Sequence, residues 1–432
     1  MTGSYQVASN LLLWQSTSTF TAPAKHSVWA PVTEILTDGS FFVASAFHGP
    51  DYPPGSNNGA GIRMWHLSSL LEVIGVPVDL GPFLEAGING GSECYPVGMA
   101  VGKNRVLMVS TGAFFSNDHF NANQYSWIID CSGTSPVVQT THMFYNNGTQ
   151  VGQYDSMENS CFYDAATERA FIGSYGRAAA TAEVVAVEVF NATTGQRLAS
   201  GKGDKGGRWY GGSGCIGLYM NPLDSTKIVA IDPYVTTGTS SGYTVEFSFT
   251  VPLDGSSVTC TGSQVLPREL GGWQFAAGSP YISGGPGVIA DDATSKNVNY
   301  YGPDGTILFS SPHTIYYTGD NLSTDNGRNL IGWFEDGGPG WKDPYGVLFI
   351  VDQTSRTMEE LNLPFFGSPG GPQSADNPQQ TLSADSGGNT LLLGANVQTF
   401  DYKTYSLLLW VVSRGPNLAG QLLDDRVRFH GK

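Results

Sequence analysis

Residues Thr37–Ser45, with the sequence Thr-Asp-Gly-Ser-Phe-Phe-Val-Ala-Ser, join a tight polar turn to an apolar strand that ends in small residues. The same turn and strand recur six more times, with successive copies roughly 40 to 65 residues apart. The later copies have their strands at Val106–Ser110, Ala170–Ser174, Ile228–Ile231, Val288–Ala290, Leu330–Trp333 and Leu391–Gly394. An internal repeat of this length decides the architecture before any single motif does.

Each copy is flanked by further apolar strands, such as Tyr243–Phe249 with its alternation of apolar and polar residues, so the unit reads as a four-stranded sheet. The most helix-like stretches, 68–74 and 357–361, are short. Repeated four-stranded units of this spacing resemble the β-propeller superfamily. We therefore predict an all-β fold in which residues 1–432 form a single β-propeller domain.

Seven blades are expected, at approximately 26–80, 92–145, 158–201, 214–266, 278–311, 318–363 and 381–423. Six blades remain an alternative, because the unit at 278–311 is compressed and could elaborate a neighbouring blade. A propeller must close its ring or leave sheet edges exposed. The apolar strand at residues 5–14 is expected to close the ring by completing the last blade beside Ser406–Val412.

Two hairpins resemble the Asp box of sialidase-like propellers, Ser-x-Asp-x-Gly. They are Ser323-Thr-Asp325-Asn-Gly327 and, more loosely, Ser383-Ala-Asp385-Ser-Gly387. The resemblance implies a structural role, in which the Asp accepts backbone N–H groups and the Gly takes a positive φ. Sialidase chemistry would also need an arginine cluster, a Tyr–Glu pair and an acidic Asp. Arginines are sparse and scattered here, so the motif favours the fold and not the activity.

Composition restricts the partners and cofactors. The chain has 37 acidic and 21 basic residues, a net charge of −16, and no Lys/Arg stripe, so nucleic acid is not expected to bind. Seven histidines and five cysteines show no metal-binding spacing, so we predict no metal site and no cofactor, although acidic loops leave Ca²⁺ possible. The cysteines are expected to be free thiols, with Cys94, Cys161 and Cys215 in first strands and Cys131 and Cys260 further out.

The first residues, Met1–Gln6, lack the basic and apolar regions of a secretory signal. The apolar run Leu11–Trp14 is too short to span a membrane, so membrane insertion is not expected. We predict that the protein resides in a virus particle, or outside the cell without a cleaved signal peptide in this chain, and is cytoplasmic before assembly.

Aromatic and polar residues concentrate in the loops between second and third strands and between blades, which emerge on one face of a propeller. Flat aromatic rings beside carboxylates suit sugars, which stack through their apolar face and form hydrogen bonds around the rim. The candidate ligand-binding residues are His48, Asp51, Tyr52, Phe114, Asp118, His119, Arg177, Trp209, Tyr210, Trp273, Asp336, Trp341, Asp343 and Tyr345. Packing beneath long loops or at protein contacts is the alternative role for these aromatics, and no catalytic residue can be assigned.

These features favour a non-enzymatic propeller of a phage or virus particle, as a tail, fibre or capsid-decorating protein. Its expected partners are other virion or appendage subunits and a host surface polysaccharide. A carbohydrate-active enzyme, either a glycoside hydrolase or a lyase, is the alternative and would need a carboxylate pair flanking the scissile bond. An intracellular scaffold of the WD40 type is disfavoured because Trp-Asp and Gly-His blade signatures are missing.

Overall fold

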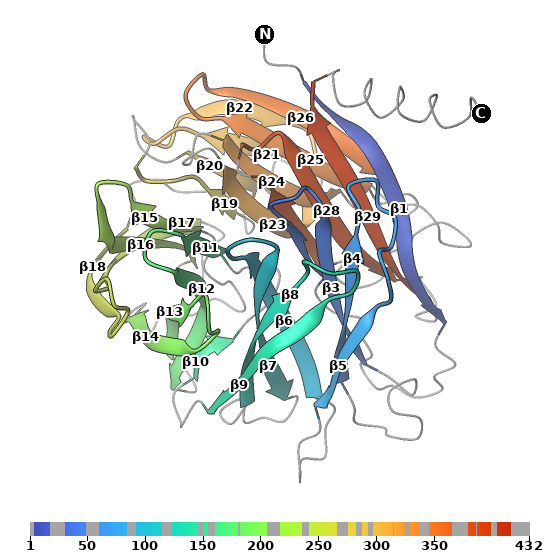
Figure 1. Cartoon of the computed structure of the whole chain (residues 1–432). Helices are drawn as coiled ribbons and strands as arrows, with labels where there is room; N and C mark the ends of the chain where they lie inside the picture. Colours follow the sequence, from blue (N-terminus) through green and yellow to red (C-terminus); the bar gives the residue numbers. More distant parts are fainter. Residues whose placement is uncertain are drawn as a thin grey trace.

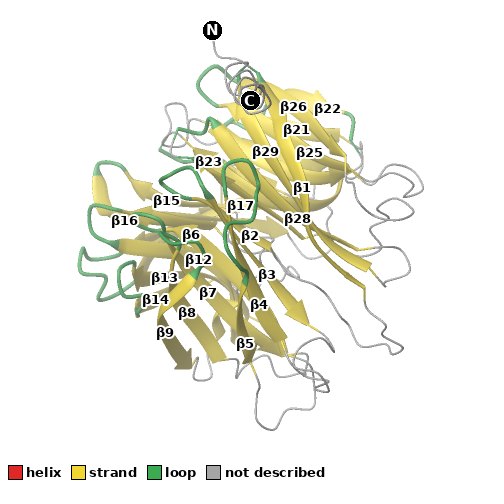
Figure 2. Cartoon of the chain, turned by 45° about the vertical axis from the view of Figure 1, so that its right-hand side comes forward, coloured by secondary structure: helices red, strands yellow, loops and turns green. Residues whose placement is uncertain are grey.

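The computed structural model describes residues 4–17, 31–48, 60–83, 92–114, 123–145, 150–153, 160–179, 182–204, 217–235, 242–265, 275–281, 287–292, 297–313, 315–324, 329–336, 345–364, 379–385, 387–398 and 404–415. These residues form strands, turns and bends, without a helix. The strands make seven antiparallel sheets that follow one another around a ring in chain order (Figures 1 and 2). The protein is therefore a seven-bladed β-propeller, as the repeats predict, and the six-bladed alternative is wrong.

In blades one to six the strands run outward from the ring axis in chain order, and in blade seven the N-terminal strand takes the outermost position. Blade one contains β2 (Pro31–Ile35), β3 (Phe41–His48), β4 (Ala60–Leu67) and β5 (Val78–Phe83), and blade two contains β6 (Ser92–Ala100), β7 (Arg105–Phe114), β8 (Asn123–Asp130) and β9 (Val137–Tyr145). Blade three contains β10 (Gln150–Gln153), β11 (Ser160–Asp164), β12 (Arg169–Ala179), β13 (Ala182–Asn191) and β14 (Arg197–Asp204). In blade three, β10 and β11 both pair with β12 and share the innermost position.

Blade four contains β15 (Gly217–Asn221), β16 (Asp224–Val235), β17 (Gly242–Thr250) and β18 (Thr259–Val265), and the compressed blade five contains β19 (Phe275–Ala277), β20 (Val288–Asp292), β21 (Asn297–Tyr301) and β22 (Ile307–Ser311). Blade six contains β23 (Ile315–Thr324), β24 (Asn329–Asp336), β25 (Tyr345–Asp352) and β26 (Thr357–Pro364). Blade seven contains β27 (Gln379–Ala384), β28 (Thr390–Gln398), β29 (Thr404–Arg414) and β1 (Tyr5–Thr17).

The N-terminal strand closes the ring, as expected. Strand β1 is antiparallel to β29 and pairs from Tyr5 opposite Arg414 to Thr17 opposite Thr404, which makes it the outermost strand of blade seven. In Figure 1 the blue β1 lies beside the red β29. Because β1 covers the outer edge of β29, the last blade has four strands, as its neighbours do.

The core is divided among the interfaces between successive blades. In each sheet, alternate residues face one neighbouring blade or the other, because side chains alternate across a strand. The interface between blades six and seven includes Trp333 and Trp410, whose rings meet edge to face with centroids 5.6 Å apart. Six further apolar clusters contain most of the other buried apolar side chains of the described blades.

A buried arginine joins blade three to blade four. Arg169 begins β12 and its side chain is 1% exposed. Its guanidinium donates to Asp164 Oδ2 at 3.0 Å and Thr167 Oγ1 at 2.6 Å, and across the interface to the carbonyls of Ser225, Val251 and Pro252. All five N–H donors of the guanidinium therefore have acceptors, which is the condition for burying such a charge.

Many hairpin turns share one device, an Asp or Asn side chain that accepts the backbone N–H two residues later. Five examples are Asp38 with Ser40, Asp130 with Ser132, Asp254 with Ser256, Asp304 with Thr306 and Asp352 with Thr354. The turn forms because the carboxylate replaces a backbone acceptor and fixes the chain reversal locally. This Asp-x-Ser/Thr pattern is a blade signature in its own right.

The second Asp-box-like hairpin follows the expected pattern with one difference. Asp385 Oδ1 accepts the N–H of Asn389 at 2.8 Å, and a positive φ of 64° is found at Gly388, the residue after the motif glycine. Residues 325–328 of the first hairpin lie outside the described residues.

The two helix-like stretches are not helical. Residues 357–361 belong to strand β26, and residues 68–74 form a turn in which Leu71 has a φ of 64°. Pairing with β25 outweighs the local helix propensity of Thr357–Leu361, because each residue gains ladder hydrogen bonds.

Candidate functional site

The two faces of the ring differ in which connections they carry. We call the turn face the one with the hairpins between first and second strands and between third and fourth strands, such as residues 36–40 and 131–136. The loop face is the opposite one, where second strands end at His48, Phe114 and Asp336.

The backbone places five of the sequence-predicted residues near the loop face. His48, Phe114 and Asp336 end β3, β7 and β24, Arg177 lies near the end of β12, and Tyr345 begins β25. The others, Asp51, Tyr52, Asp118, His119, Trp209, Tyr210, Trp273, Trp341 and Asp343, lie outside the described residues. Ligand binding by these residues therefore stays a prediction.

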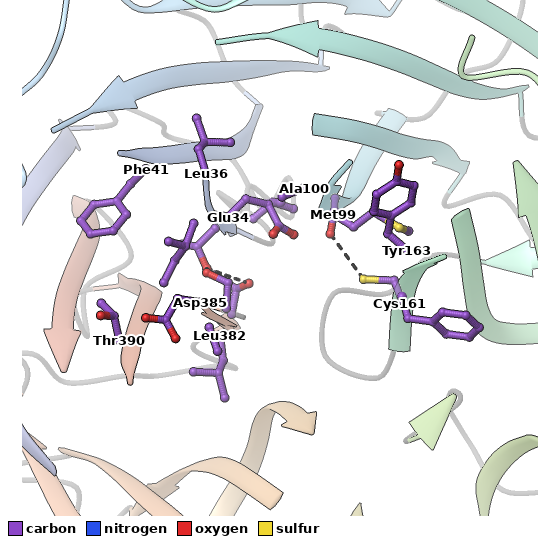
Figure 3. A pocket seen from close by; sticks show the side chains of 18 of the residues that line it. Glu34, Leu36, Phe41, Met99, Ala100, Cys161, Tyr163, Leu382, Asp385 and Thr390 are labelled. Atoms are coloured by element: carbon purple, nitrogen blue, oxygen red, sulfur yellow. Dashed lines mark hydrogen bonds between the residues drawn. The ribbon is translucent and has the colours of Figure 1, made fainter. Parts of the chain in front are cut away.

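A cavity of about 1330 Å³ lies on the ring axis. Innermost strands of five blades line it, through Pro31–Ile35 of β2, Pro96–Ala100 of β6, Ser160–Tyr163 of β11, Leu218–Met220 of β15 and Thr381–Ala384 of β27. Figure 3 shows part of this lining, with Glu34 and Leu382 from blades one and seven and Met99 and Cys161 from blades two and three. The cavity extends to the turn face, because the turn residues Thr37–Gly39 also line it.

One part of the cavity continues outward between blades one and seven. Its lining includes Phe41 of β3, Thr390 of β28, and Val411 and Ser413 of β29, which are second and third strands. We call this part the junction arm, defined by these four residues. Beyond the innermost strands, the described lining reaches second and third strands only at this ring-closing junction.

The charged side chains that line the described cavity are all acidic. They are Glu34 on β2, Asp38 in the turn that follows, and Asp385 in the corresponding turn of blade seven. Burial opposes ionisation of Asp38, but hydrogen bonds from Ser40 and Asn104, with the nearby His66, outweigh it and lower the pKa of this carboxyl. Asp38 is therefore a fixed negative charge and not a proton donor at neutral pH.

Hydroxyl groups form a second part of the lining. Thr33, Thr381 and Ser383 lie where the innermost strands of blades one and seven meet, with Oγ1 of Thr33 3.5 Å from Oγ1 of Thr381 and 3.3 Å from Oγ of Ser383. Ser160 and Ser279 add hydroxyls from blades three and five. Cys161 Sγ contacts the carbonyl of Gly98 at 3.5 Å, which ties β11 to β6 inside the lining.

Three tyrosines give the cavity aromatic surface. Tyr163, Tyr219 and Tyr281 belong to blades three, four and five. Burial, with smaller contributions from Glu246 and Asp224, raises the pKa of Tyr281 to about 12, so its hydroxyl stays protonated and can donate a hydrogen bond at neutral pH. The cavity therefore offers rings, donors and acceptors together.

Metal binding and thiol chemistry find little support in the described part of the chain. No group of three or more His, Cys, Asp or Glu side chains there could hold a metal ion. Cys131, Cys161 and Cys260 are free thiols, and burial raises the pKa of Cys131 to about 12, which makes it unreactive. No helix among the described residues is long and apolar enough to cross a membrane.

Sequence reasoning missed the axial cavity. Its lining alternates hydroxyl, small and apolar residues, as in Thr33, Ser160 and Thr381, and such residues give no motif. They come together only because the innermost strands of different blades meet at the axis. The available signal was that hydroxyl and carboxylate residues occur in first strands, where an apolar core strand would carry Val, Ile or Leu.

No family model matches the chain, and no curated protein is similar to it at a significant level. Solved propellers do resemble it in fold. The Penicillium chrysogenum α-L-arabinanase in complex with arabinobiose is 11% identical, with a TM-score of 0.47, over 94% of this chain and 98% of that one. The ectodomain of the parainfluenza virus 5 hemagglutinin-neuraminidase is 11% identical, with a TM-score of 0.44, over 94% and 86%.

The C-terminal WD40 domain of Sif2 is 10% identical, with a TM-score of 0.42, over 94% of this chain and 99% of that domain. At such identities the likeness concerns the fold alone, which the seven sheets already establish.

Proposed function

We propose that this protein is a non-enzymatic saccharide-binding propeller whose binding site is the axial cavity. The observation that carries the proposal is the composition of that cavity, with tyrosine rings, hydroxyls and carboxylates in a space of about 1330 Å³. Sugars are bound by aromatic rings against their apolar face and by donors and acceptors around their hydroxyls. The cavity is large enough for a short oligosaccharide, since ligand pockets commonly have volumes of ~300–1,000 Å³.

Binding without hydrolysis fits the carboxylates better than catalysis does. Glycosidases need a carboxylic acid that stays protonated near neutral pH beside a second carboxylate. The Asp38 carboxyl has a lowered pKa, and the Asp385 carboxylate accepts a backbone N–H within its turn. Two of the three lining carboxylates, Asp38 and Asp385, are therefore occupied in fixing hairpins. The glycoside hydrolase or lyase alternative predicts release of new reducing or unsaturated ends from a bound polysaccharide.

We further propose that the propeller is a component of a phage or virus particle, in which it contacts neighbouring subunits and a host surface polysaccharide. The support is the composition, with abundant Gly and a net charge of −16. Mass spectrometry of purified particles tests the location, because a particle component is present in a fixed ratio to the capsid protein.

The binding site is tested by blocking the cavity and the loop face separately. A glycan array and titration calorimetry identify a ligand for the wild-type protein, and Ser160→Tyr then places a bulky side chain in the cavity from β11. We expect Ser160→Tyr to abolish ligand binding. The substitutions Trp209→Ala and Trp341→Ala, at two of the residues predicted on the loop face, should leave ligand binding unchanged. The reverse pattern would move the site to the loop face and overturn the cavity assignment. Circular dichroism checks that each variant is folded.

A further inference from the structure

The charge in the axial cavity indicates which saccharides it accepts, and this inference rests on the proposed function. We propose that the cavity selects neutral or amino-bearing oligosaccharides and rejects those that carry carboxylate or sulfate groups. Neither the fold nor the sequence motifs require such a selection. It follows from which side chains the ring brings to its axis.

The first step in the argument is the sign of the charges. Glu34, Asp38 and Asp385 line the cavity, whereas no Lys, Arg or His is among its described lining residues. An anionic sugar needs a cation, most often an arginine that grips the carboxylate with two hydrogen bonds. Here it would meet carboxylates in a partly enclosed space, where like charges repel more strongly than in open solvent.

The second step is that two arginines of the neighbouring blades have their partners outside the cavity. Arg169 donates all its N–H groups to Asp164, Thr167 and three carbonyls at the interface between blades three and four. Arg63 forms two hydrogen bonds with Asp79 on the outer part of blade one, at 2.7 and 2.9 Å. Neither of these two side chains lines the cavity.

The third step is an unsatisfied hydroxyl in the junction arm. Ser413 lines the cavity and is 2% exposed, and its Oγ has no hydrogen-bond partner among the described residues. Buried hydroxyls are normally paired, so an unpaired one beside a cavity points to a polar ligand that supplies the missing partner. A sugar hydroxyl can donate or accept, and it carries no charge into the acidic surroundings.

A protonated amine is also compatible with this cavity. The carboxylates of Glu34 and Asp385 come from adjacent blades, and Figure 3 shows both in the pocket lining. An ammonium group on a glucosamine residue would be attracted by both charges. Amino sugars are therefore expected to bind at least as tightly as their neutral counterparts.

The experiment uses trimers that share one β-1,4 backbone and differ in charge through a single substituent on each sugar ring. These are glucose, glucosamine and glucuronic acid trimers, titrated against the full-length wild-type protein by calorimetry at low salt. We expect the glucuronic acid trimer to bind at least about tenfold more weakly than the glucose trimer, and higher salt to narrow the gap because it screens the repulsion. The glucosamine trimer should bind at least as tightly as the glucose trimer.

A matched pair of variants assigns the selection to the cavity. Glu34→Gln removes one lining charge and should reduce the ratio between the neutral and acidic trimers by roughly threefold or more. Glu72→Gln removes an exposed charge in the β4–β5 turn that does not line the cavity, and it should leave the ratio unchanged. If Glu34→Gln does not fold, the salt dependence of the wild-type ratio still tests the repulsion.

The outcomes separate the two proposals. If none of the trimers binds, and a wider array of neutral and acidic glycans also gives no ligand, the proposed function is wrong. If the neutral and acidic trimers bind equally, or if Glu72→Gln changes their ratio as much as Glu34→Gln does, saccharide binding stands and the charge selection is overturned.

Discussion

The junction between blades three and four and the junction between blades seven and one are both apolar, yet their polar contacts differ. The first contains the buried Arg169 with five hydrogen bonds and an ion pair to Asp164 at 3.0 Å. The second contains neutral hydroxyls, with Thr33 3.3 Å from Ser383 and 3.5 Å from Thr381, next to the cavity.

The difference shows where each junction obtains its strength. Blades three and four are consecutive in the chain, and a side chain joins their turns across the interface. Blades seven and one close the ring, and there eleven residues of β1 pair with β29 through the backbone. We infer that strand pairing is the main element that closes this ring and that the hydroxyl contacts contribute little.

The largest expected effect is the loss of β1. Removal of residues 1–17 exposes the edge of β29 and uncovers apolar side chains of blade seven, so we expect aggregation or loss of the cooperative unfolding transition. Size-exclusion chromatography and thermal melting by circular dichroism measure this. Removal of residues 416–432, an equal number, leaves every described strand in place and should preserve both the wild-type elution volume and the transition. A truncated 18–432 chain that melts like the wild type would contradict the role assigned to β1.

A smaller but still large effect is expected from Arg169→Met. The substitution leaves Asp164 and three carbonyls without their buried partner, which typically costs ~3–5 kcal/mol of unfolding free energy. Urea denaturation measures the loss. The matched control is Arg63→Met, because Arg63 and Asp79 are a third and a quarter exposed and such pairs contribute about 1 kcal/mol or less. Equal losses in the two variants would refute the special role of the blade three–four junction.

Acid should weaken the same junction by a moderate amount. Burial of Asp164 opposes its ionisation, but hydrogen bonds from Thr167, Arg169 and the Ala166 N–H outweigh burial and lower its pKa. Its contribution is therefore complete above the unfolded carboxyl pKa of about 3.9 and is lost as the pH falls through the lower folded pKa.

Urea midpoints measured between about pH 5 and pH 3 test this contribution. Wild type should lose on the order of 1 kcal/mol more than Asp164→Asn over this range. Thr33→Val, at the other junction, should show the same pH slope as wild type because it removes no charge. Parallel slopes for wild type and Asp164→Asn would rule out the depressed pKa.

The smallest effect is expected from Thr33→Val. Its hydroxyl contacts are long, at 3.3 to 3.5 Å, and neutral hydrogen bonds contribute only ~0.5–1.5 kcal/mol even at good geometry. We expect a loss below about 1 kcal/mol in urea denaturation, well under that of Arg169→Met. A loss of similar size to that of Arg169→Met would show that the hydroxyls help to close the ring.

The sequence predicted those parts of the fold that depend on local periodicity. The turn and strand at Thr37–Ser45 recur closely enough to count seven units, and the apolar strand before the first unit was expected to pair with Ser406–Val412. Blade five was harder, because its first strand, Phe275–Ala277, has only three residues, too few for a period to show.

The polar interior could not be predicted in the same way. Arg169 looks like an ordinary turn residue in the sequence, and only the approach of blade four supplies the carbonyls that allow its burial. The cavity residues Thr33, Ser160 and Thr381 are more than a hundred residues apart along the chain, and only ring closure brings them to the axis. Local patterns carry no information about distances between blades.

The order of strands in blade seven has a consequence for synthesis. Tyr5 leaves the ribosome about 400 residues before its partner Arg414, a delay of roughly 20 to 80 seconds at the usual rates of translation. During that time Leu11 and Leu12 have no strand to pair with in their own chain. A neighbouring chain whose β29 has formed but has not yet paired with its own β1 offers the same edge. We therefore expect that, on crowded polysomes, β1 of one chain can pair with β29 of another and link the two rings.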